Sequence, residues 1–259
     1  MKIAITGKGG VGKTTLASLL AYHYAAQARP VLAIDADPSP CLGPALGFPE
    51  EKLVRLRPIA EMEALIAERT GSQPGSSGSF FKLNPRVDDL PDRFSVVHNG
   101  IRLLLLGAVE RGGSGCICPE SALLKQLVTH ILLRRDEVVL LDLYAGVEHL
   151  GRATADSVDA MLIVVEPTTR SLSTARQIKM LAADIGVQRV YLVGNKTRDA
   201  ADEQFITENS PGLPFLGCFP VSPHVITADR TGQALYELDP TCVTKTAEIA
   251  DALEALLGF

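Results

Sequence analysis

The chain has 259 residues, 46% of them hydrophobic, which is enough to bury the core of one α/β domain. Its formal net charge of −5 argues against a general nucleic-acid binder, because the domains of such proteins are usually basic. No apolar run approaches the roughly 18 residues that span a bilayer, and no signal stretch opens the chain, so we expect a cytoplasmic protein with no membrane partner. Five cysteines, an odd number, indicate reduced thiols rather than a disulfide framework.

The first motif is a glycine-rich stretch, residues 7–15, between an apolar run and a helical pattern that begins near Leu16. A glycine, four residues and then Gly-Lys-Thr at a strand-to-helix junction predict a loop that binds nucleotide phosphates. Lys13 would reach the β- and γ-phosphates, and the Thr14 hydroxyl would bind Mg²⁺. The residues expected to hold the nucleotide here are Gly9, Gly10, Val11, Gly12, Lys13, Thr14 and Thr15. A glycine-rich turn with no ligand is the alternative.

Two aspartates follow the next apolar strand, which begins at Val31. Asp35 and Asp37 fall at the carboxyl end of this strand, where open α/β sheets place their ligands. Their spacing puts both on one face, and two acids beside a triphosphate would serve Mg²⁺ or an attacking water. A pair of turn or helix-capping aspartates is the alternative, because Asp37-Pro38 is common turn chemistry.

The next segments alternate between helical, polar and extended patterns. Residues 58–69 have helical composition, and residues 70–79 are too poor in apolar side chains to pack, which predicts a mobile surface loop. The pair Asn99-Gly100 between two apolar runs predicts a hairpin, with a single loop entering a buried strand as the alternative. Residues 103–106 are apolar throughout, as in a strand covered on both faces.

Cys116 and Cys118 precede a helix that we expect to begin at Pro119. The helix dipole and free N–H groups there lower the pKa of a thiol and favour the thiolate that soft metals bind. One Cys-x-Cys pair supplies half of a tetrahedral thiolate site, and a second copy of the chain would supply the rest. Two reactive cysteines that bind no metal are the alternative. Three further cysteines lack such a partner and are expected in the core: Cys41, Cys218 and Cys242.

A third acid, Asp142, ends the apolar strand 138–142 and is expected to hold Mg²⁺ directly or through water, with a strand-ending cap as the alternative. His149 is expected to be a structural residue rather than a metal ligand. Further strands are expected at 161–167, 190–196 and 215–219, and helices at 171–185 and 244–257. This alternation predicts one domain over residues 1–259, an α/β fold with a doubly wound, mostly parallel sheet and helices on both faces.

Lys8, the second lysine of the glycine-rich stretch, points to a subgroup of such loops. The stretch KGGVGKTT resembles the deviant phosphate loops of the MinD/ParA and nitrogenase iron-protein superfamily, whose members are ATP-dependent dimers. The resemblance implies that Lys8 crosses a dimer interface to the partner's nucleotide and that Asn195 contacts adenine. It also implies that Asp37 positions the attacking water and Asp35 helps hold the water shell of Mg²⁺. A solvated lysine and a turn asparagine are the respective alternatives for Lys8 and Asn195.

A narrower resemblance covers nearly the whole chain. The stretches GGSGCICPE and DLYAGVEHLGR together resemble the CooC family, nickel-inserting ATPases that mature carbon monoxide dehydrogenase. The resemblance implies a homodimer promoted by ATP and metal, with Ni or Zn between subunits on Cys116 and Cys118, and a client that is carbon monoxide dehydrogenase or acetyl-CoA synthase. Two departures concern hydrolysis: Tyr144 stands where that family usually has an acid, and Ser39-Pro40-Cys41 replaces a loop that often contains asparagine.

Two other functions remain open on the sequence. A MinD/ParA-type positioning ATPase would need a basic DNA-binding face or an amphipathic membrane helix, and the acidic residues 251–257 lack the lysines that favour anionic lipids. An electron-transfer ATPase would hold an iron–sulfur cluster between subunits, again with four cysteines.

Overall fold

The computed structural model describes residues 1–74, 80–107, 118–134, 136–144 and 157–258. Within these residues the strands form one eight-stranded sheet in the order β3-β4-β2-β5-β1-β6-β7-β8. Every neighbouring pair is parallel except β3 and β4, which are antiparallel. The strands are β1 (Lys2–Gly7), β2 (Val31–Ala36), β3 (Val96–His98), β4 (Ile101–Leu105), β5 (Val138–Leu143), β6 (Ala160–Val165), β7 (Val190–Thr197) and β8 (Phe215–Pro220).

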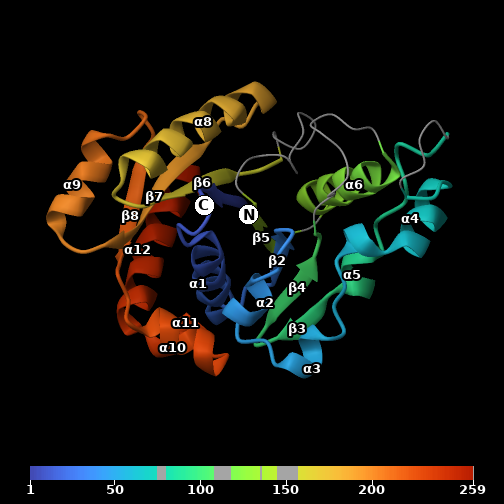
Figure 1. Cartoon of the computed structure of the whole chain (residues 1–259), viewed down its shortest axis with the longest axis horizontal. Helices are drawn as coiled ribbons and strands as arrows, with labels where there is room; N and C mark the ends of the chain where they lie inside the picture. The colour runs from blue at the N-terminus through green and yellow to red at the C-terminus, as the bar shows by residue number, and fades with distance from the viewer. Residues whose placement is uncertain (75–79, 108–117, 135, 145–156, 259) are drawn as a thin grey trace.

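Helices cover both faces of this sheet, as Figure 1 shows. The described helices are α1 (Lys13–Ala26), α2 (Leu42–Ala45), α3 (Glu50–Leu53), η1 (Ile59–Glu61), α4 (Glu63–Thr70), α5 (Leu90–Phe94), α6 (Pro119–Arg134), α8 (Thr169–Ile185), α9 (Ala200–Glu208), α10 (His224–Thr231), α11 (Leu235–Leu238) and α12 (Pro240–Leu257). One core lies between the sheet and α1, α11 and α12, and the other lies between the sheet and α4, α6 and α8. The predicted doubly wound fold is confirmed.

Alternation along the strands divides the side chains between the two cores. Ile3 and Ile5 of β1 face α1, whereas Ala4 between them faces the opposite core. Because helices cover both faces, the central strands are buried along their whole length and read as continuous apolar runs in the sequence.

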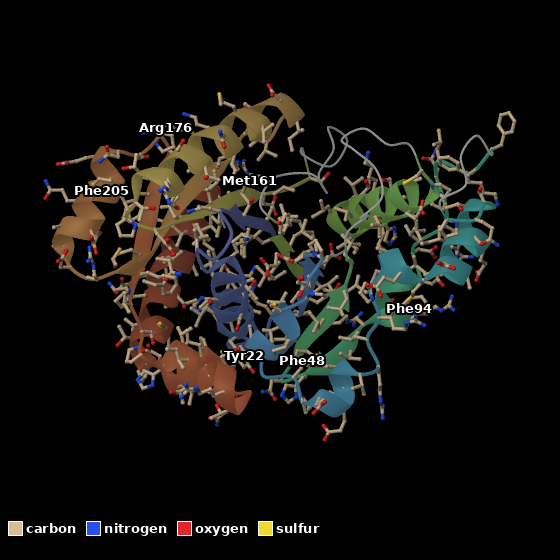
Figure 2. All side chains as sticks on the ribbon, viewed as in Figure 1. Tyr22, Phe48, Phe94, Met161, Arg176 and Phe205 are labelled. Atoms are coloured by element: carbon tan, nitrogen blue, oxygen red, sulfur yellow. The ribbon has the colours of Figure 1, made fainter. Side chains whose placement is uncertain are left out.

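The aromatic ring of Tyr22 anchors α1 to its neighbours (Figure 2). It stacks on the ring of Tyr236 in α11, with the centroids 5.3 Å apart. Its hydroxyl donates to the carbonyl of Leu46 at the end of α2, at 2.8 Å, and accepts from the Asn99 amide, at 3.2 Å. These contacts fix the helix whose amino end carries the glycine-rich loop.

The hairpin predicted at Asn99-Gly100 is confirmed. His98 of β3 pairs with Ile101 of β4, and the φ angles of Asn99 and Gly100 are 48° and 76°. Positive φ at both central residues is the backbone of a type I′ turn, which Asn-Gly adopts at low cost.

Several boundaries differ from the sequence-based expectations: α8 begins at Thr169, β6 ends at Val165, and the helical segment expected at 58–69 is divided into η1 and α4. Two further differences have a clear physical reason. α12 begins at Pro240, four residues early, because the Asp239 carboxylate accepts from the N–H groups of Thr241 and Cys242 and caps the helix. Thr70, the first residue of the expected mobile loop, is instead the buried last residue of α4, and its hydroxyl donates to the Ile66 carbonyl. Residues 75–79 of that loop lie outside the described residues. No described helix is long and apolar enough to cross a membrane.

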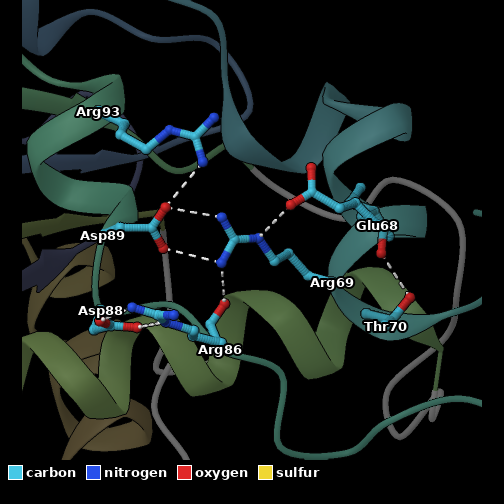
Figure 3. A network of polar contacts seen from close by, with 8 residues as sticks. Glu68, Arg69, Thr70, Arg86, Asp88, Asp89 and Arg93 are labelled. Atoms are coloured by element: carbon cyan, nitrogen blue, oxygen red, sulfur yellow. Dashed lines mark hydrogen bonds and ion pairs between the residues drawn. The ribbon is translucent and has the colours of Figure 1, made fainter.

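A charged network joins α4 to α5 (Figure 3). Arg69 makes two hydrogen bonds to the Asp89 carboxylate, at 3.0 and 2.8 Å, and Arg93 adds a third at 2.9 Å. These hydrogen bonds, with that from Arg69 the strongest influence, hold the pKa of Asp89 well below its usual range.

We expect Asp89→Asn to lower the melting temperature at pH 7 by about 1 to 3 °C, because this partly exposed network loses its central charge. The contribution of a carboxylate with a lowered folded pKa is fully present above its unfolded pKa and disappears as the pH falls. The gap between wild type and variant should therefore shrink below about pH 4. Thermal melts from pH 7 to pH 3 measure it, with Asp88→Asn as the control, because among the described residues the Asp88 side chain forms an ion pair with Arg86 alone. A gap that stays constant across this range would contradict the assignment.

Candidate functional site

The glycine-rich loop joins β1 to α1 at the carboxyl edge of the sheet (Figure 1). Gly12 precedes the first helical residue and has a φ of 101°, in the left-handed region that favours glycine. A Cβ atom at Gly12 would lie 2.1 Å from Nδ2 of Asn195. Glycine is therefore required at this position both by the backbone angle and by the neighbouring side chain.

Lys13 begins α1 and is a buried cation with an exposed fraction of 8%. Its ammonium group makes no hydrogen bond or ion pair with any residue that the structure describes. Lysine is almost never buried without a charged partner, so this position favours an anion from outside the chain. The helix amino terminus beside it favours the same sign of charge. Lys8, on the same loop, is only partly buried and also makes no ion pair with the described residues.

Asp142 lies on β5 beside this loop and is 2% exposed. The Thr14 hydroxyl donates to its Oδ2 at 2.7 Å, and Oδ1 has no hydrogen-bond partner among the described residues. Burial raises the pKa of Asp142 to about 7, and the Asp35 charge adds to the rise. A buried carboxylate with an unpaired oxygen beside a threonine hydroxyl is a set of hard oxygen ligands, which fits Mg²⁺.

Asp35 is the register partner of Asp142 on the neighbouring strand β2, so the sheet places the two acids side by side. Its Oδ1 accepts from the N–H of Asp37 at 3.1 Å, and its Oδ2 accepts from Cys41 and Leu42 at 2.9 and 2.8 Å. Burial raises the pKa of Asp35 to about 6 against these hydrogen bonds. Asp35 therefore shapes the loop between β2 and α2, which is the turn and capping role that the sequence analysis offered as the alternative.

Asp37 follows β2 in this loop and is half-buried. Its Oδ1 accepts from the Ser39 N–H at 2.9 Å, which is the Asx turn offered as the alternative reading of this residue. Because this bond uses one of the two carboxylate oxygens, the second remains available to a water or ligand.

Asn195 reaches the glycine-rich loop from the end of β7. Its Nδ2 donates to the Val11 carbonyl at 2.7 Å, and the next residue, Lys196, donates from its ammonium group to the Gly10 carbonyl at 2.7 Å. The sequence analysis assigned no role to Lys196, although its place directly after Asn195 at a strand end was the available signal.

A cavity of about 420 Å³ opens beside the loop, between α1, α2 and α10. Thr14, Thr15 and Cys41 border it together with Val225 and Ile226 of α10. This volume is within the range of small-molecule sites, roughly 300 to 1,000 Å³. Residues 224–235 carry no recognisable motif, so their approach to the loop could not be predicted from the sequence.

The cysteines separate into different environments. Cys118 is half-buried before α6, and its Sγ accepts from the Ser121 N–H at 3.5 Å. Burial raises the pKa of this thiol more than the hydrogen bonds lower it, so the expected lowering at this helix end is wrong for Cys118. Cys116 and His149 lie outside the described residues. The described residues contain no group of three or more metal-binding side chains of the His, Cys, Asp or Glu type.

The three remaining cysteines were all expected in the core, and only one of them is buried there. Cys242 is 2% exposed, which confirms the expectation. Cys218 is half-buried, with its thiol 3.5 Å from Glu203. Cys41 is exposed at the cavity, because the Asp35 hydrogen bonds turn the loop outward from the end of β2.

Comparisons with known proteins agree with this geometry. A family model described as the CobQ/CobB/MinD/ParA nucleotide binding domain matches residues 2–235. The carbon monoxide dehydrogenase accessory protein CooC of Rhodospirillum rubrum is 46% identical over 258 residues, which cover 100% of this chain and 98% of that protein. An uncharacterized ATP-binding protein of Methanocaldococcus jannaschii is 46% identical over 237 residues, 91% of each chain. The structure of MinD from Pyrococcus horikoshii OT3 with Mg-ADP superposes with a TM-score of 0.68 at 17% identity, covering 99% of this chain and 96% of that chain.

We expect Lys13→Ala to weaken ATP binding by at least about 100-fold, because the variant loses the buried lysine at the end of the glycine-rich loop, whose charge would face the phosphates. The fold should remain, since the Lys13 side chain makes no hydrogen bond to the described chain. Calorimetric titration with ATP measures the affinity, and circular dichroism checks the fold. Lys125→Ala, at an exposed position on α6, is the control and should bind like wild type. Tight ATP binding by folded Lys13→Ala would remove this loop from the phosphate site.

Proposed function

The chain belongs to the CobQ/CobB/MinD/ParA nucleotide-binding family and to its CooC group, and we propose on this basis that it is a Mg²⁺-dependent ATPase. We further propose that it works as a dimer to assist nickel insertion into carbon monoxide dehydrogenase or acetyl-CoA synthase. The observation that carries the ATPase proposal is the pair of buried groups Lys13 and Asp142: among the described residues, the Lys13 ammonium makes no hydrogen bond or ion pair, and Oδ1 of Asp142 has no hydrogen-bond partner.

Each residue of the site has a separate task in this proposal. Lys13 and the N–H groups of the loop bind the negatively charged phosphates, and their fixed positions stabilise charge that develops during transfer. Thr14 and Asp142 hold Mg²⁺, which when bound neutralises phosphate charge. Asp35 keeps the following loop in place through three backbone hydrogen bonds, which fix the position of Asp37 after the end of β2.

Asp37 orients the attacking water in this proposal, through the oxygen that the Ser39 turn leaves available. Lys8 extends to the nucleotide of a second subunit in this proposal. This role would explain why the Lys8 ammonium makes no ion pair with the described residues of its own chain. ATP would then order both sites across a dimer interface, and hydrolysis would release that order.

Nickel is the cargo of the proposed reaction rather than a resident cofactor. A thiolate site for Ni²⁺ or Zn²⁺ takes four ligands, and the described residues of one chain offer no such group. Cys118 and Cys116 from two subunits would complete it, and Cys118 already lies at a helix end with its thiol half-exposed. The printed name of the CooC relative supplies the client class in this proposal.

We expect Asp37→Ala to retain ATP binding and to lower ATP turnover by about 100-fold or more, because only water positioning is removed. Its dimer should also last longer in ATP, since hydrolysis no longer ends the bound state. Phosphate release measures turnover and sedimentation measures the dimer. Asp37→Asn is the matched variant, because its amide oxygen can still accept from Ser39 and keep the turn; it should be equally slow. Near-normal turnover in either variant would exclude Asp37 from the mechanism.

We expect one Ni²⁺ or Zn²⁺ to bind per dimer through Cys116 and Cys118, and to promote dimer formation without nucleotide, because a shared ligand favours the assembled state. Cys116→Ser and Cys118→Ser should lose the metal and keep ATP binding. Cys218→Ser is the control and should bind metal normally. Metal titration with sedimentation measures both effects. One metal on each monomer, or unchanged affinity in both variants, would contradict an intersubunit site.

A further inference from the structure

Two consecutive residues at the end of β7 hold two consecutive carbonyls of the phosphate loop. Asn195 donates to the Val11 carbonyl, and Lys196 donates to the Gly10 carbonyl, both at 2.7 Å. The Lys196 ammonium also donates to the carboxylate of Glu166 at 2.6 Å. Glu166 is the residue directly after β6. The loop is thus bound to the ends of two neighbouring strands by side chains.

This arrangement requires an unusual backbone. Successive side chains of a regular strand point to opposite faces, so residues 195 and 196 would not both reach one loop. Lys196 has a φ of 57°, in the left-handed region, and the register between β7 and β8 shifts between Gly194 and Thr197. The left-handed residue breaks the alternation, and both side chains then reach the same loop.

The other described non-glycine residues with positive φ have ordinary explanations. Ala28 follows the end of α1, and Asn99 is in the β3–β4 hairpin. Lys196 lies inside a strand, where a side chain with a Cβ atom is strained in this conformation. Such strain persists where the surroundings impose it, and it concentrates at functional sites.

The two hydrogen bonds also fix which way the loop's amides point. The carbonyl of one residue and the N–H of the next belong to one planar trans peptide and point in opposite directions. No described peptide bond is cis. Holding the carbonyls of Gly10 and Val11 toward β7 therefore turns the N–H groups of Val11 and Gly12 toward the other side of the loop, where the Val11 N–H donates to the Lys8 carbonyl at 3.4 Å.

We propose that Lys196 is a positioning residue for nucleotide binding, which fixes the Gly10–Val11 peptide and so keeps the turn of the loop that presents its remaining N–H groups to the phosphates. The inference rests on the proposed ATPase function. Glu166 holds the ammonium in place, and its own N–H donates to Ser171 Oγ in the first turn of α8, at 3.0 Å. Lys196 acts through the loop and does not itself contact the phosphates.

The test compares Lys196→Met with Lys196→Gly. Both variants lose the ammonium, but methionine keeps an aliphatic side chain and the strained backbone, whereas glycine removes the side chain and relieves the positive φ. A loss of affinity that both variants share therefore follows from the missing ammonium rather than from strain or packing. We expect both to raise the Kd for ATP and for ADP about tenfold, and to raise KM with kcat within about twofold of wild type, because uniform binding is removed. The melting temperature of Lys196→Gly without nucleotide should equal or exceed that of wild type.

Glu166→Gln is the matched control. The glutamine oxygen can still accept from Lys196, and the bond to the Gly10 carbonyl remains, so we expect its Kd for ATP to stay within about twofold of wild type. Wild-type affinity in folded Lys196→Gly, or a loss in Glu166→Gln equal to that in Lys196→Gly, would overturn the assignment. Failure of wild type itself to bind ATP would instead overturn the proposed function.

Discussion

The site depends on compensation of buried charge at the carboxyl edge of the sheet. Lys13 and Asp142 are nearly removed from solvent, and an uncompensated buried charge is costly. The chain offers Asp142 only a neutral hydroxyl from Thr14 and offers Lys13 no hydrogen bond among the described residues. The positive Lys13 lowers the pKa of Asp142, but burial and the neighbouring acid Asp35 raise it more. Such an edge is most stable with an anion and a cation bound, which is the composition of a nucleotide with Mg²⁺.

The order of the strands places these charges together. β1, which precedes the glycine-rich loop, lies between β5 and β6, and β5 lies between β1 and β2. The sheet therefore aligns Asp142 with Asp35 on one side of the loop, while β6 and β7 bring Glu166 and Lys196 to the other side. One side of the loop carries the acids that suit a metal, and the other carries the donors that hold the loop's carbonyls. Binding and positioning are thus separated in space, so they can be altered by separate mutations.

The helices beside the carboxyl edge of the sheet form the other wall of the site. α1 is fixed by the Tyr22 contacts to α2 and α11, and α10 closes the cavity beside Thr14 and Thr15. The exposed thiol of Cys41 lines this cavity rather than the core. The backbone N–H of Cys41 donates to the Asp35 carboxylate, which holds the loop between β2 and α2 in this position. The loop between β2 and α2 takes its shape from the buried Asp35 carboxylate, which lies beside Asp142 in the sheet. A charged ligand bound next to Asp142 would therefore act on the same carboxylate that holds this loop.

The sequence by itself determined the fold class and located the glycine-rich loop and the acids at the strand ends, because apolar periodicity and the spacing of glycine, lysine and threonine are local properties of the chain. It also determined the hairpin, since Asn99-Gly100 specifies its turn locally. Only the tertiary structure decided which partners those residues have. The hydrogen bond between Thr14 and Asp142 joins segments far apart in sequence, and so do the hydrogen bonds from Asn195 and Lys196 to the loop. No local pattern encodes contacts that arise when strands become neighbours in a sheet.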